Sequence, residues 1–86
     1  MHLIHESTTR YSDGLIDVNI IVVLEPASFK KYTYRLSSEY IVDLFQKYLK
    51  RGRGMHRAAL ALLNHHKVLM IHGDPLEDKV ERRAWK

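Results

Sequence analysis

Residues 15–25 alternate with a period of two, and this run limits the fold more than any other feature of the chain. One set of apolar side chains falls on a single face of an extended strand: Ile16, Val18, Ile20, Val22 and Leu24. The opposite face holds Asp17 and Asn19, but also Ile21 and Val23. Since β-branched residues favour strands, the run predicts a central strand with one buried face and a second face that is partly apolar.

Two flanking segments supply partners for this strand. Residues 29–36 alternate again, with Tyr32, Tyr34 and Leu36 on one face. This second run is close enough in sequence to pair with the first as an antiparallel hairpin. Residues 2–10 precede a Ser-Asp-Gly turn signal and are expected to form an earlier edge strand. The sequence therefore predicts a small antiparallel sheet, either a β-hairpin or a three-stranded meander.

Two helices are expected after the sheet. Ser37, Ser38 and Glu39 indicate a helix start, with a serine oxygen accepting from first-turn amides. Apolar residues then follow helical spacing at Ile41, Leu44, Phe45 and Tyr48. Gly52 suits the left-handed position that closes this helix. A second helix is expected to start near Gly54 or Met55. Its core side would carry Met55, Ala59, Leu62 and Leu63.

The end of the chain admits two interpretations. The second helix either runs on to His72 or stops near Asn64, which leaves residues 68–71 as a short buried strand. Four consecutive apolar residues fit both, and we favour the strand. Asp74 followed by Pro75 then predicts a third, C-terminal helix, because Asp caps and Pro suits the first helical position.

These elements define an α+β fold in a single domain over residues 1–86. The apolar fraction of 45% is ordinary for a globular protein. The chain has no cysteine, which favours an intracellular, cytoplasmic setting over a disulfide-stapled secreted domain. The longest apolar runs, at 20–24 and 58–63, are too short to cross a bilayer, so we expect no membrane partner.

Enzyme and metal signatures are missing from the sequence. It has no Walker-type phosphate loop, no nucleophile elbow and no HExxH motif. Six histidines are present, but none has the spacing of a chelating pair on a helix, and adjacent His65 and His66 would point about 100° apart. We expect His66 to be a partly buried helix residue. The chain is therefore predicted to be non-enzymatic, with no catalytic residue, no metal site and no cofactor.

Positive charge concentrates in the middle of the chain. Residues 30–67 carry nine basic and two acidic side chains, a net charge of +7 within a total of +4. Five cations bracket the turn formed by Gly52, Arg53 and Gly54, and they are the candidate nucleic-acid-binding residues: Lys47, Lys50, Arg51, Arg53 and Arg57. The turn feeds a helix N-terminus, where free amides and the helix dipole favour an anion such as phosphate. The alternative is a tight helix connection whose cations are only solvated.

Tyr32 and Tyr34 admit two interpretations as well. On an exposed sheet face they would stack on bases of a single strand. An aromatic pair alternating on a strand is more often packed under a helix, and we favour the core position.

Several of these residues together resemble the KTSC domain, a small domain at the C-terminus of some lysyl-tRNA synthetases that also occurs alone in bacterial proteins. The resemblance spans about residues 14–66. It rests on Tyr32-Thr33-Tyr34 after an alternating strand, on the segment 36–41 that opens a helix, and on Gly52-Arg53-Gly54 before the next helix. It implies a non-enzymatic accessory domain that acts near RNA.

The leading hypothesis is thus a small accessory module that binds nucleic acid, RNA rather than DNA, through the basic turn between the helices. The alternative is a protein-interaction or homo-oligomeric module, a homodimer in the simplest case. A core this small would gain from a second chain.

Overall fold

The computed structural model describes residues 1–24 and 28–73. Its elements, in chain order, are β1 (His2–Arg10), β2 (Ile16–Leu24), β3 (Ser28–Leu36), α1 (Glu39–Lys50), the 3-10 turn η1 (Arg53–Met55), α2 (His56–His66) and β4 (Leu69–His72). The α+β fold class is therefore confirmed. The helix predicted from Asp74 lies outside the described residues.

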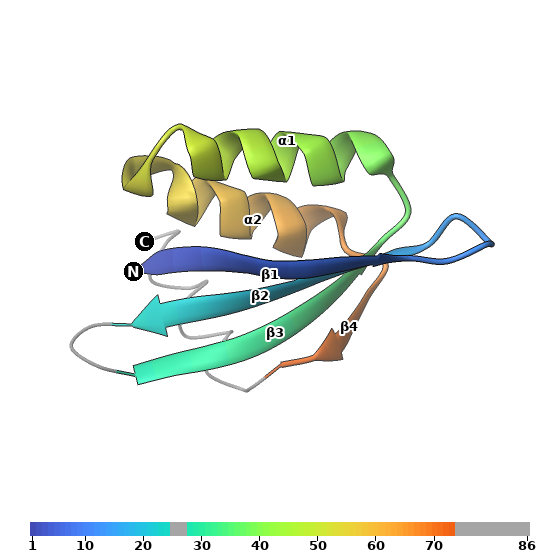
Figure 1. Ribbon diagram of the computed structural model, residues 1–86, viewed down its shortest axis with the longest axis horizontal. Coiled ribbons are helices and arrows are strands. Elements are labelled where there is room, and N and C mark those ends of the chain that lie inside the picture. The colour runs from blue at the N-terminus through green and yellow to red at the C-terminus, as the bar shows by residue number, and fades with distance from the viewer. Residues whose placement is uncertain (25–27, 74–86) are drawn as a thin grey trace.

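The strands form one antiparallel sheet in the order β1-β2-β3-β4 (Figure 1). The predicted meander is confirmed, and β4 extends it by pairing with β3, for example Leu69 with Arg35. The strand interpretation is thus the correct one, shifted by one residue to Leu69–His72, but the predicted burial is wrong: β4 is an edge strand, and Leu69 and Ile71 are exposed. Both helices lie over the same face of the sheet, and the other face is here named the open face (Figure 1).

The core lies between the helices and the face that the alternation predicts. Ile16, Val18, Ile20 and Val22 are buried, and Leu24 is half-buried. β3 adds Tyr32, Tyr34 and Leu36 to the same layer. The two helices contribute the opposite layer of buried apolar side chains: Ile41, Val42, Phe45, Ala59, Leu60 and Leu63. The two tyrosines are therefore core residues, as favoured, and cannot offer their rings to bases.

The start of α1 is where the serine signal predicts it, but the capping chemistry is different. Ser38 occupies the N-cap position and its side chain makes no capping hydrogen bond. The first turn is tied instead to the end of β1, because the guanidinium Nε of Arg10 donates to Oε1 of Glu39 at 2.9 Å. This ion pair links the two elements across the rim of the core.

The core side of α2 differs from the prediction by one helical position. Its buried residues are His56, Ala59, Leu60 and Leu63, whereas Leu62 is only half-buried. The helix begins at His56, and the spacing of three, four and seven from that residue selects Leu60 over Leu62. Among the described residues, no helix has the length and apolarity needed to cross a bilayer.

The open face carries one buried carboxylate near the β1–β2 turn. Asp17 is 5% exposed, accepts from Nε of Arg35 at 2.8 Å, and accepts from the hydroxyl of Tyr11 at 2.9 Å. The Arg35 guanidinium is the main cause that lowers the pKa of Asp17. This cluster fixes the pairing of β2 and β3 at that end of the sheet.

Replacing Ile20 by Asp tests which face is buried. Ile20 has no exposed surface, so Ile20→Asp buries an unpaired carboxylate at a cost of several kcal/mol, against a total stability of about 5–15 kcal/mol. We expect the variant to be unfolded by circular dichroism at 25 °C. A melting temperature close to that of the wild type would show that the assigned facing is wrong.

Candidate nucleic-acid interface

The connection between the helices is a short, sharply bent turn. α1 ends at Lys50, Arg51 follows as its C-cap, and Gly52 adopts a φ of 121°. Its ψ is 174°, so Gly52 is extended with a positive φ and does not adopt the left-handed helical conformation predicted for it; only glycine takes either conformation readily. Residues Arg53–Met55 then form η1 and lead directly into α2.

All five predicted binding residues are exposed and lie along this connection. Lys47 and Lys50 occupy the last turn of α1, where positive charge complements the helix dipole. Arg51 and Arg53 flank Gly52, and Arg57 lies in the first turn of α2. The structure thus brings the predicted residues together at one end of the helical layer.

The amides available to an anion differ from those expected. The N–H of Met55 donates to the carbonyl of Gly52 at 3.0 Å, and the N–H of His56 donates to that of Arg53. The 3-10 turn therefore satisfies two of the amides that the sequence predicts to be free near the start of α2. These two amides are not available to a phosphate, whereas the exposed arginine side chains are.

The electrostatics of this turn are unbalanced. No acidic residue lies in the first turn of η1 or of α2, while Arg53 and Arg57 place positive charge at the positive end of a helix. Within residues 1–24 and 28–73, the ion pairs join Arg10 to Glu39, Lys31 to Glu6 and Arg35 to Asp17. An anion bound at the positive end of α2 would interact favourably with the helix dipole and with the exposed cations around it.

The buried imidazole of His56 anchors the turn to the sheet. Its Nδ1 accepts from the backbone N–H of Leu3 at 2.9 Å, and the ring makes a further backbone hydrogen bond with Leu49. One side chain therefore connects β1, the end of α1 and the start of α2. Because Nδ1 is the acceptor, the neutral ring carries its proton on Nε2.

The start of β1 joins the basic end of the molecule. The N-terminus lies on the same side as the α1–α2 connection in Figure 1. Arg53 Nη2 and His2 Nδ1 are 3.4 Å apart, and the rings of His2 and His56 are 6.1 Å apart. The sequence reasoning missed this contribution, since residues about fifty positions apart are brought together only by the fold.

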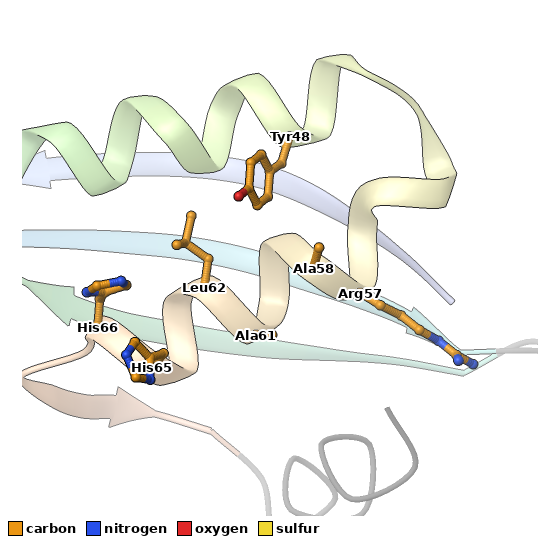
Figure 2. Close-up of a pocket in the computed structure, with 7 residues that line it drawn as sticks. All are labelled: Tyr48, Arg57, Ala58, Ala61, Leu62, His65 and His66. Carbon is orange, nitrogen blue, oxygen red and sulfur yellow. The ribbon is translucent and has the colours of Figure 1, made fainter. Parts of the chain in front are cut away.

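A groove of about 410 Å³ runs along the outer side of α2. Its lining comes from one residue of α1 and a stretch of nearly three turns of α2: Tyr48, Arg57, Ala58, Ala61, Leu62, His65 and His66. In Figure 2 the Tyr48 ring extends from α1 toward α2 on the side of Leu62, and Arg57 lies at the opposite end from the two histidines. His66 is exposed, contrary to the partial burial expected, because α2 ends at this residue.

Metal-ligating side chains do not gather in the described part of the chain. No group of three or more His, Asp or Glu residues lies close enough together to hold a metal ion there. His65 and His66 are neighbours with ring centroids 4.8 Å apart in an edge-to-face arrangement, and no carboxylate among the described residues joins them.

Comparison with known proteins adds no relative: neither the family models, nor the curated proteins, nor the solved structures contained a match to this chain.

The stability of the protein should decrease as the pH falls below about 6.5 because of His56. Burial is the main cause that lowers its pKa, and His2, Arg53 and the N-terminal amino group act in the same direction. A lowered pKa means that the unfolded chain binds the proton first. The contribution of His56 is therefore complete above pH 6.5 and is lost as the pH falls through the folded pKa.

Urea unfolding at pH 7.5 and 5.0 checks this prediction in the wild type and in His56→Asn, which keeps an acceptor but does not titrate. We expect a smaller pH dependence in the variant. His72→Asn is the matched control, because His72 is exposed on β4. A pH dependence in His56→Asn equal to that of the wild type would show that another group is responsible.

Proposed function

We propose that this chain is a small, non-catalytic module that binds nucleic acid, RNA rather than DNA, through the basic turn between α1 and α2. The observation that carries the proposal is the concentration of exposed cations around the start of α2 without an acidic residue in its first turn. Arginine presents a planar fork that matches phosphate oxygens, and lysine adds a mobile point charge.

The rigidity of the turn supports the same proposal. The cations project from a segment held by Gly52, by η1 and by the buried His56. A preorganised set of charges loses less conformational entropy on binding than cations on a mobile tail. Phosphate contacts carry no sequence information, so we expect weak sequence preference.

The resemblance to the KTSC domain supports an accessory role near RNA, and a cysteine-free chain with such a partner fits the cytoplasm. The buried positions of Tyr32 and Tyr34 exclude them as a stacking platform. Any contact with bases must therefore come from other aromatic side chains.

The salt dependence of RNA binding tests the role of the turn. If about four phosphates are contacted, log Kd should change with log salt concentration with a slope of about 3 to 4. The double variant Arg53→Ala with Arg57→Ala should bind more weakly and with a slope lower by about 1.5, because two counterion-releasing contacts are lost. Fluorescence anisotropy with labelled RNA between 50 and 300 mM salt, roughly the range over which such binding weakens strongly, gives both values.

Arg10→Ala is the control for this experiment, and it is matched in charge to the single variant Arg57→Ala. It removes one cation from the far end of β1, about 26 Å along the strand from His2. We expect it to leave the affinity and the slope unchanged. Equal effects of Arg10→Ala and Arg57→Ala would mean that net charge, and not the turn, governs binding. Failure of the wild type to bind RNA or DNA at about 50 mM salt would remove the proposal.

One observation favours a second candidate function, that of a protein-interaction or homo-oligomeric module. Large apolar side chains are exposed on the open face, with Ile4 at 44%, Phe29 at 63% and Leu69 at 54%. Exposed apolar surface of this kind is common at interfaces between chains. Analytical ultracentrifugation distinguishes the two functions: a monomer of 10.1 kDa at tens of micromolar, roughly the range of weak dimers, would argue against self-association.

A further inference from the structure

The groove on α2 combines a cationic end with an aromatic and apolar body. Arg57 belongs both to the groove and to the basic turn. From there the groove follows α2 for about nine residues, or roughly 13 Å, to His65 and His66. Beyond Arg57, the groove therefore offers uncharged surface to a ligand.

The hollow exists because the middle of the groove is lined by small side chains. Ala58 and Ala61 leave room one helical turn apart, and Leu62 supplies apolar surface between them and Tyr48 (Figure 2). The volume of about 410 Å³ is within the range of roughly 300–1,000 Å³ in which small planar ligands bind.

Aromatic rings border this hollow at two places. The Tyr48 ring approaches from α1, and the imidazoles of His65 and His66 stand at the far end of α2 (Figure 2). Rings of these types stack on nucleobases, and imidazole nitrogens can also form hydrogen bonds with base edges. A nucleotide has the matching distribution, with an anionic phosphate at one end and a planar base at the other.

We infer that the groove receives one unstacked base of a single strand whose adjacent phosphate is held by Arg57. This inference rests on the proposed function and specifies its ligand. A base inside a duplex is stacked and paired, so it cannot enter the groove without the cost of extruding it. The protein therefore selects single-stranded over double-stranded nucleic acid, although the phosphate contacts alone would serve both.

Filling the groove separates this inference from the proposed function. Ala58 is exposed and Ala61 is half-buried on a helix, where leucine is nearly as favourable as alanine, so Ala58→Leu and Ala61→Leu should both fold. Each variant should bind a labelled single-stranded RNA of about twelve nucleotides roughly tenfold more weakly, as expected when one stacked base is lost. The slope with salt should stay at the wild-type value, because no phosphate contact is removed.

Two comparisons control this experiment. Ser12→Leu adds the same side chain in the exposed β1–β2 turn, at the opposite end of the sheet, and should bind the single strand as the wild type does. A hairpin RNA with a fully paired stem should bind more weakly than the single strand to the wild type, and with similar affinity to the wild type and to both filled variants.

Small probes give a second, independent readout. In titrations followed by NMR, adenosine monophosphate should shift the methyl signals of Ala58 and Ala61, whereas inorganic phosphate should perturb Arg57 but leave these methyls unchanged.

The outcomes distinguish the groove inference from the proposed binding by the basic turn. Wild-type affinity in both filled variants, or equal affinity of the wild type for hairpin and single strand, would overturn the groove inference and leave the basic turn as the binding surface. Absence of any binding to the wild type would overturn both. Capture of an apolar peptide in the groove, with no response of the alanine methyls to the nucleotide, would assign the groove to a protein partner and also overturn the inference.

Discussion

The helix-covered face of the sheet determines where every other feature of this molecule lies. Ile20, Tyr32 and Tyr34 are buried there, and a period of two places their side chains on that face together. α1 and α2 must cover this layer, which directs the turn between them to one end of the sheet (Figure 1). A shift of one residue in the register of β2 would turn its buried side chains, Ile16, Val18, Ile20 and Val22, to the other face, so the hydrophobic pattern determines which face the helices cover.

His56 holds the basic turn in place against the sheet. Its ring accepts from the backbone of Leu3 and bonds to the backbone of Leu49, so one buried side chain ties the turn to the sheet. Burial among cations favours the neutral form of the ring. The hydrogen bonds to the backbone offset the cost of removing the ring nitrogens from water. The result is a fixed set of positive charges beside the groove on α2.

The strands, both helices and the basic turn could be predicted from the sequence, because alternation, helical spacing and glycine positions are local signals. The face of α2 and the anchoring role of His56 could not. A lone histidine in a basic segment has no local pattern that marks it as buried, and its partner Leu3 is 53 residues away. The groove was also missed, since it depends on Tyr48 approaching Ala58 and Ala61 from another helix.

Mapping the bound strand on the protein tests the central claim most directly. Backbone amide shifts of isotope-labelled protein would be followed by NMR during titration with a single-stranded RNA at low salt. The account predicts that the largest changes lie between residues 47 and 66, over the basic turn and α2, and that the open face around Phe29 and Leu69 is unaffected. Changes confined to the open face, with the amides of residues 47–66 unmoved, would contradict it.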